Sequence, residues 1–151
     1  MAGPVSAYLL DTNVILRLYH PHSPEFPFIR KAISSLHRTN VGLYYFSQNL
    51  IEFWSVSTRP ISQNGYGLSP AETDQIAKQI EKAFILLPEV KTIHDEWRRL
   101  VVDYGVSGAK VHDARLVAGM IAHGIRHILT LDESGFARYP EVVAVSPKNI
   151  S

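Results

Sequence analysis

Short apolar runs alternate along the chain with segments whose apolar residues recur at helical spacing. A short continuous apolar run is typical of a buried strand, whereas apolar residues at i, i+3, i+4 and i+7 mark one face of a helix. The runs predict strands at 8–10, 43–46, 84–87, 127–131 and 142–145. Helical spacing between the runs predicts helices over 12–20, 28–36, 50–55, 93–104 and 114–125. This alternation predicts an α/β fold in three layers, a mostly parallel sheet of about five strands with helices on both faces.

Capping signals add detail to this pattern. Ser69, Pro70 and Glu72 form a strong helix start, in which the serine caps, the proline takes the first helical position and the glutamate closes a capping box. Ser47 is the expected N-cap of the helix that follows the second strand. Gly124 is the expected C-terminal stop of the 114–125 helix.

Composition narrows the class of protein. The chain has 151 residues, of which 46% are hydrophobic, so we expect a single folded domain over 1–151 and exclude a disordered protein. Fifteen Lys and Arg against fourteen Asp and Glu give a net charge of +1, which is too balanced for a polycation that coats nucleic acid. The absence of cysteine excludes disulfides and thiolate zinc sites. With no run of about 18 apolar residues and no basic leader, we expect no membrane association and a cytoplasmic location.

Four acidic residues stand where a ligand site is expected in such a fold. Asp11 and Asp132 follow predicted strands, Asp113 opens a predicted helix, and Glu52 lies in the first turns of another. Ligands of open α/β sheets bind beyond the carboxyl ends of the strands, so these acids could converge on one edge. Four oxygen donors without cysteine suit Mg²⁺ or Mn²⁺. Such an ion activates water and stabilises the charge that develops in phosphodiester cleavage.

Each acid also has a structural interpretation. An aspartate after a strand is a common turn former or helix cap, and Asp113 could simply favour the N-terminus of its helix. Glu52 is harder to explain in this way. Its neighbours Ile51, Phe53 and Trp54 are expected in the core, so an acid there needs a partner.

Four segments together resemble a PIN domain, and their order and spacing match that family over nearly the whole chain. They are 9–14 (LLDTNV), 49–52 (NLIE), 108–114 (GAKVHDA) and 129–132 (LTLD), with Phe136 after the last acid. Segment 104–115 is especially similar to the single-domain PIN ribonucleases of bacterial toxin–antitoxin pairs, the VapC type.

The resemblance implies an endoribonuclease that depends on Mg²⁺ or Mn²⁺, forms a homodimer, and has a cognate antitoxin protein as partner and RNA as substrate. Asp11, Glu52 and Asp113 match the three core acids of the family, and Asp132 matches a fourth, more variable one. The positions that support the site are a small polar slot at Asn13 and two hydroxyl positions, Thr12 and Thr130.

Other functions remain open at this point. A haloacid-dehalogenase-like phosphatase requires Asp-x-Asp, but this chain has Asn13 two residues after Asp11. The phosphate-binding loop Gly-x-x-x-x-Gly-Lys-Ser/Thr is absent. Two alternatives keep the fold: an inert PIN-like scaffold that binds RNA or protein, and a PIN ribonuclease with a housekeeping role in RNA processing.

Basic and aromatic residues have weaker claims to function. His112 is expected in a turn, and Tyr66 and Phe136 are expected to pack rather than to stack on a base. Most basic residues are expected to form a scattered, solvated surface rather than a guide for RNA phosphates; those considered are Arg98, Arg99, Lys110, Arg115 and Arg126.

Overall fold

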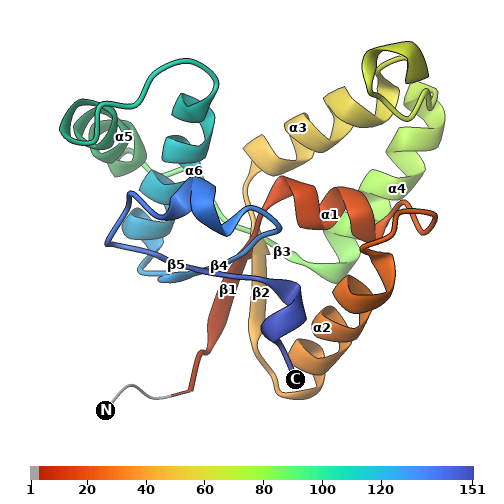
Figure 1. Ribbon diagram of the computed structural model, residues 1–151, viewed down its shortest axis with the longest axis horizontal. Coiled ribbons are helices and arrows are strands. Elements are labelled where there is room, and N and C mark those ends of the chain that lie inside the picture. The colour runs from red at the N-terminus through yellow and green to blue at the C-terminus, as the bar shows by residue number, and fades with distance from the viewer. Residues whose placement is uncertain (1–3) are drawn as a thin grey trace.

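The sheet is parallel throughout. The computed structural model describes residues 4–151, which form a five-stranded sheet in the order β3-β2-β1-β4-β5 (Figure 1). The strands are β1 (Ala7–Leu10), β2 (Gly42–Tyr45), β3 (Ile85–Leu86), β4 (His127–Leu129) and β5 (Val143–Val145). The predicted α/β class and parallel sheet are confirmed. Because β1 lies between β2 and β4, the residues that follow β1 and β4 are neighbours at the carboxyl edge.

Three strands, β3, β4 and β5, are shorter than predicted, β5 by one residue. β4 ends at Leu129, and the backbone N–H of Leu131 donates to the Asn13 side chain at 3.2 Å instead of to a strand. At the sheet edge, Phe84 closes the helix before β3, and its N–H donates to the carbonyl of Ile80. The backbone N–H groups of Leu131 and Phe84 therefore bind a side chain and a helix end, although the apolar pattern assigns both residues to strands.

Six helices of the described chain cover the two faces of the sheet. They are α1 (Thr12–Leu18), α2 (Phe26–Arg38), α3 (Ser47–Thr58), α4 (Pro70–Ala83), α5 (Thr92–Asp103) and α6 (Lys110–His123). Alternate residues of β1 point to opposite faces: Leu10 packs among residues of α1 to α4, and Leu9 among residues of α5 and α6. Figure 1 shows these two groups of helices on either side of the strands, which gives the three expected layers.

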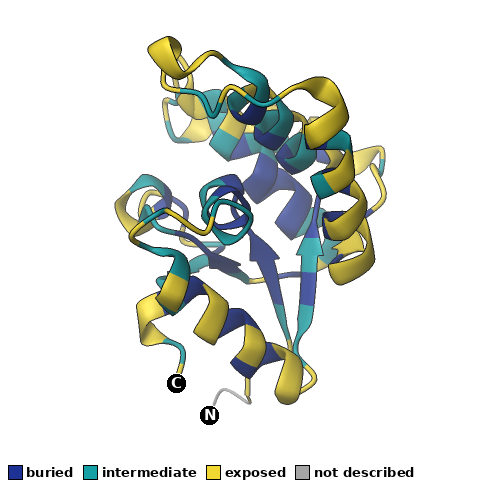
Figure 2. Cartoon of the chain, turned by 90° about the vertical axis from the view of Figure 1, so that its right-hand side faces the viewer, coloured by how far each residue is buried: buried dark blue, intermediate teal, exposed yellow. Residues whose placement is uncertain are grey.

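Burial follows this arrangement. In Figure 2 the buried residues gather on the strands and on the helix faces that turn toward them, while the outer helix faces are exposed. No helix within residues 4–151 combines the length and the apolar character needed to cross a bilayer.

The helix ends confirm two capping predictions and correct a third. The Ser69 hydroxyl accepts from the N–H of Glu72 at 3.1 Å, the Glu72 carboxylate accepts from the N–H of Ser69 at 3.0 Å, and Gly124 ends α6 at φ +68°. The prediction that Ser47 is the N-cap of α3 was wrong, because Ser47 is already the first helical residue and Phe46 is the N-cap. There the Asn49 side chain accepts from the Phe46 N–H at 2.8 Å and so satisfies the end of the helix.

The start of α6 also differs from expectation. His112 does not lie in a turn but in the first turn of α6, which begins at Lys110, four residues before the apolar face starts at Ala114. Gly108, with φ +63°, lets the chain change direction just before the helix. Lys110, His112 and Asp113 are therefore all helical.

Candidate functional site

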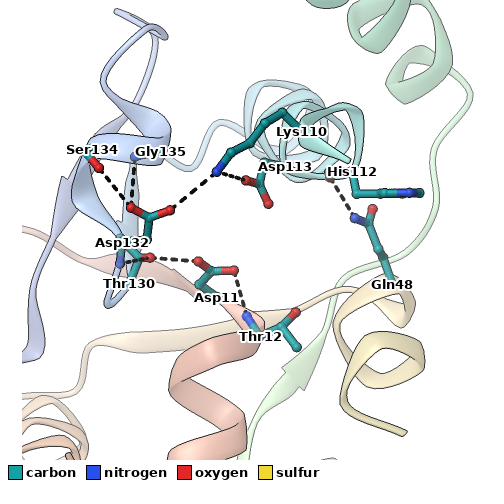
Figure 3. Close-up of polar contacts among 10 residues, drawn as sticks. All are labelled: Asp11, Thr12, Gln48, Lys110, His112, Asp113, Thr130, Asp132, Ser134 and Gly135. Carbon is teal, nitrogen blue, oxygen red and sulfur yellow. Dashed lines mark hydrogen bonds and ion pairs between the residues drawn. The ribbon is translucent and has the colours of Figure 1, made fainter. Parts of the chain in front are cut away.

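A cleft of about 960 Å³ opens beyond the carboxyl end of the sheet. The four acids singled out in the sequence all line it: Asp11 after β1, Glu52 on α3, Asp113 on α6 and Asp132 after β4. Figure 3 shows three of these acids and the polar groups around them. Four segments that are far apart in the sequence thus meet at one edge, where parallel α/β sheets carry their ligand sites.

Asp11 is the most buried of the four acids, with 7% of its surface exposed. It caps α1: one carboxylate oxygen accepts from the Thr12 N–H at 2.8 Å, and the other accepts from the Thr130 hydroxyl at 2.7 Å (Figure 3). Burial raises the pKa of Asp11 to about 6, because these two hydrogen bonds only partly offset the loss of hydration and because Asp113 and Glu52 add repulsion. A buried, rigidly held carboxylate of this kind favours the approach of positive charge.

Glu52 is held by a chain of hydrogen bonds rather than by a cation. The Thr12 hydroxyl donates to the Glu52 carboxylate at 2.6 Å, and the Asn49 amide in turn donates to the Thr12 oxygen at 3.1 Å. Gln48, one turn before Glu52, donates to its second oxygen at 3.4 Å. These hydrogen bonds hold the Glu52 carboxylate against α1.

The neighbours of Glu52 are only partly in the core. Phe53 is fully buried and Trp54 is half-buried, but Ile51 is 67% exposed, so its placement in the core was wrong. The face of α3 that packs inward carries Asn49 and Phe53, which are four residues apart, and this turns Ile51 outward into the cleft.

Asp113 and Asp132 share one lysine. The Lys110 ammonium lies 3.6 Å from an oxygen of Asp113 and 3.5 Å from an oxygen of Asp132 (Figure 3). Burial raises the pKa of Asp113, the nearby Lys110 opposes this, and Glu52 adds to it. The pKa of Asp132 is lowered, first by a hydrogen bond from the Ser134 hydroxyl at 3.0 Å.

The four carboxylates line one cleft but do not surround a single point. Within residues 4–151, no three acidic or histidine side chains are close enough to hold one ion among them as they stand. Lys110 lies between two of the acids instead. Of the supporting residues, Thr12 and Thr130 contact Glu52 and Asp11, whereas Asn13 contacts the backbone of Leu131.

Sequence reasoning missed Lys110, Gln48 and Asn49 as members of the site. For Lys110 a signal was present, because it precedes Asp113 by three residues on a helix, a spacing that puts both on one face. Gln48 also precedes its partner Glu52 by one helical turn, but its second partner, the His112 carbonyl, is 64 residues away. The contact of Asn49 with Thr12 spans 37 residues and had no local signal.

Among the other basic residues, Arg115 lines the cleft and pairs with Glu89 at 2.9 Å, and Arg59, which was not considered, also lines it. Arg99 binds Glu96 and Glu141 on the surface.

The two aromatic candidates pack, as expected. Phe136 is 2% exposed, and the ring of Tyr66 stacks on that of His20 with centroids 3.5 Å apart.

The parallel sheet, the helices on both faces and the cleft at its carboxyl edge define a three-layer α/β protein with an acid-lined cleft. The sequence model of the PIN domain matches residues 8–142, so the chain belongs to the PIN domain family. A search of curated proteins finds no significant match.

Solved structures share the fold at low sequence identity. One chain of DNA-bound VapBC from Salmonella typhimurium is 14% identical with a TM-score of 0.70, and the match covers 95% of this chain and 99% of that one. VapBC2 from Rickettsia felis, bound to a promoter DNA fragment, matches at 15% identity and a TM-score of 0.68, over 93% and 98%. A toxin-antitoxin complex from Klebsiella pneumoniae matches at 17% identity and a TM-score of 0.64, over 93% and 97%.

Proposed function

We propose that the protein is a divalent-metal-dependent endoribonuclease, the toxin of a type II toxin–antitoxin pair, which hydrolyses RNA phosphodiester bonds. The observation that carries the proposal is the convergence of Asp11, Glu52, Asp113 and Asp132 on one cleft, with Asp11 buried and held by two hydrogen bonds. Membership of the PIN family supports a nuclease, and the VapBC neighbours support the toxin role.

The donor set fits a hard divalent cation. All four proposed ligands are carboxylates, and no sulfur donor is available because the chain has no cysteine. The Lys110 ammonium between Asp113 and Asp132 is a cation already at the site. Burial and the neighbouring acids raise the pKa of Asp11, so a bound cation would stabilise its ionised form. Bound by Asp11, Glu52, Asp113 and Asp132, Mg²⁺ or Mn²⁺ would polarise a phosphodiester oxygen and acidify a water molecule.

The chain's own residues then hold these carboxylates in place. The Thr130 hydroxyl and the Thr12 N–H each occupy one oxygen of Asp11, which fixes the plane of that carboxylate. The Thr12 hydroxyl, itself held by Asn49, orients Glu52. Asn13 ties the start of α1 to the segment after β4, so that Asp11 and Asp132 keep their spacing. Oriented carboxylates reduce the reorganisation that the reaction would otherwise require.

Arginines at the walls of the cleft complete the proposed substrate site. Arg59 at the end of α3 and Arg115 on α6 both line the cleft, on elements that carry Glu52 and Asp113. A guanidinium group can donate two parallel hydrogen bonds to one phosphate. We therefore expect these side chains to bind backbone phosphates of RNA beside the acids.

The proposed partners follow from the neighbours. The similar chains come from VapBC structures and a toxin-antitoxin complex, and we extend a cognate antitoxin to this chain on that ground. A homodimer and a cytoplasmic place of action belong to the same proposal.

The test is cleavage of a structured RNA by the purified protein with Mg²⁺ or Mn²⁺. We expect chelator to abolish cleavage, and Asp11→Asn and Asp113→Asn each to lower the rate at least about 100-fold, because a metal contributes several kcal/mol to the transition state. Asp132→Asn should lower it less, and the exposed Asp95→Asn should leave it unchanged.

Two outcomes would contradict the proposal. Unchanged cleavage by Asp11→Asn would refute the site. Tight RNA binding without cleavage by the parent would favour the inert scaffold instead.

A further inference from the structure

Within residues 4–151, Lys110 is the one basic residue that contacts the carboxylates of two proposed metal ligands. It begins α6, and its ammonium lies 3.6 Å from Asp113 Oδ2 and 3.5 Å from Asp132 Oδ2. Asp113 is on the same helix, but Asp132 follows β4, so the lysine joins two separate elements. Its side chain is 48% exposed, which leaves room for the ammonium to move into the cleft or solvent.

The surroundings of this contact are shaped for it. The other oxygen of Asp132, Oδ1, accepts from the Ser134 hydroxyl at 3.0 Å and the Gly135 N–H at 3.2 Å, so Oδ2 is turned toward Lys110 (Figure 3). A Cβ on Gly135 would lie 2.5 Å from Asp132 Oδ2 and 3.4 Å from the Lys110 ammonium. Because Gly135 has no side chain, the Asp132 carboxylate and the Lys110 ammonium can occupy this space.

The lysine and a divalent ion would compete for the negative charge of the same two carboxylates. Mg²⁺ binds carboxylate oxygens at about 2.0–2.1 Å, which is far inside the distance that Lys110 now keeps. An ammonium so close to a divalent cation would repel it strongly in a partly buried cleft. Binding of the ion is therefore expected to weaken the contacts of Lys110 with Asp113 and Asp132.

We propose that Lys110 is the built-in counter-ion of the metal-free site and competes with the divalent ion for Asp113 and Asp132. This inference rests on the proposed function, because it concerns the ligands of the same ion. Without metal, the single charge of the lysine offsets part of the repulsion between Asp113 and Asp132 and between them and the other two acids. With metal, the same charge weakens binding, so the affinity of the site is set partly by the lysine.

The experiment is calorimetric titration of Mn²⁺ into the full chain at fixed pH and ionic strength. Lys110→Met removes the charge but keeps a straight side chain, Lys110→Arg keeps the charge, and Asp113→Asn removes a proposed ligand. Lys78→Met is the matched control, because Lys78 pairs with Asp74 at 3.4 Å on the surface of α4. We expect Lys110→Met to bind Mn²⁺ about tenfold more tightly than the parent, since ion pairs at partly exposed sites correspond to small free energies.

A second readout separates competition from a general change in stability. Without metal, Lys110→Met should melt below Lys78→Met, and its melting temperature should rise more than that of the parent when Mn²⁺ is added. Lys110→Arg should bind Mn²⁺ as the parent does.

The outcomes distinguish this inference from the proposed function. If the parent binds Mn²⁺ through Asp113 but Lys110→Met binds it equally or more weakly, the competition is refuted while the metal site stands. If neither the parent nor Lys110→Met binds Mn²⁺, the proposed metal site is wrong and the inference fails with it.

Discussion

Replacing Asp11 with asparagine should stabilise the metal-free protein at neutral pH, although it removes a proposed catalytic group. Burial raises the pKa of Asp11 from its ordinary value of 3.8 to about 6. One pKa unit corresponds to about 1.4 kcal/mol, so keeping Asp11 ionised lowers the free energy of unfolding by about 3 kcal/mol at pH 7 and above. Asp11→Asn removes this penalty at nearly constant volume.

The substitution also has a cost at Thr130. The asparagine oxygen can still accept from the Thr12 N–H, but its amide would face the Thr130 hydroxyl, which already accepts from the N–H of Asp132 at 2.9 Å. Losing one such hydrogen bond costs about 1 kcal/mol. The net gain is then about 2 kcal/mol, or a rise of about 4–8 °C in melting temperature for a chain of this length.

The pH dependence gives the sharper signature. A carboxyl whose pKa is raised in the folded state makes that state bind more protons than the unfolded chain. Its contribution therefore favours folding below the unfolded pKa and is lost as the pH rises through the folded value. For Asp11 the loss falls between about pH 4 and pH 6. At pH 4 the penalty is only about 0.5 kcal/mol, less than the lost hydrogen bond, so the variant should there be equal to or slightly less stable than the parent.

The assay is urea unfolding of parent and variant in chelator from pH 4 to pH 8, with the exposed Asp95→Asn as control. The difference in free energy between variant and parent should change sign between these limits, while the control should show no such crossing. The charged groups that contribute to the raised pKa of Asp11 are Asp113 and Glu52. A variant that is less stable than the parent at every pH would show that Asp11 is a structural cap and that repulsion and burial do not strain the site.

Three further predictions follow from the same contacts. Excess Mg²⁺ or Mn²⁺ should raise the melting temperature of the parent and raise that of Asp11→Asn less, because the ion binds only the folded site; equal rises would contradict a role of Asp11 as ligand. Thr130→Val should lower the free energy of unfolding by about 1–3 kcal/mol in urea, since the Asp132 N–H loses its acceptor and the buried Asp11 loses a donor; an unchanged midpoint would contradict this. Expression of the parent chain should arrest growth while Asp11→Asn is harmless, and equal tolerance of both in several hosts would favour a housekeeping ribonuclease.

The elements were largely predictable because their signals are local. The apolar face from Ala114 to Ile125, the strand before Asp11 and the capping box at Ser69 each depend on residues a few positions apart. The parallel sheet followed from the alternation of these elements, and it placed residues after different strands at one edge. The expectation that acids would converge was therefore a consequence of topology.

What could not be predicted depends on contacts across the sequence. The chain from Asn49 through Thr12 to Glu52 joins α3 to α1, and Asn49 also caps the helix start that was assigned to Ser47. The Asn49 side chain thus both caps α3 and holds the Thr12 hydroxyl, and the pattern of neighbouring residues predicted neither contact. Ile51 was misplaced for the related reason that α3 turns a polar residue, Asn49, inward, which an apolar pattern assigns outward.

The burial of the acids gives a physical order to their roles. Asp11 is almost fully enclosed, the side chain of Asp113 is 30% exposed, and that of Asp132 is 47% exposed. Water cannot reach the position of a buried carboxylate and replace it as a ligand. Water can replace an exposed carboxylate such as Asp132, which is held by Ser134 and Lys110. Removal of Asp11 should therefore affect metal binding most and removal of Asp132 least.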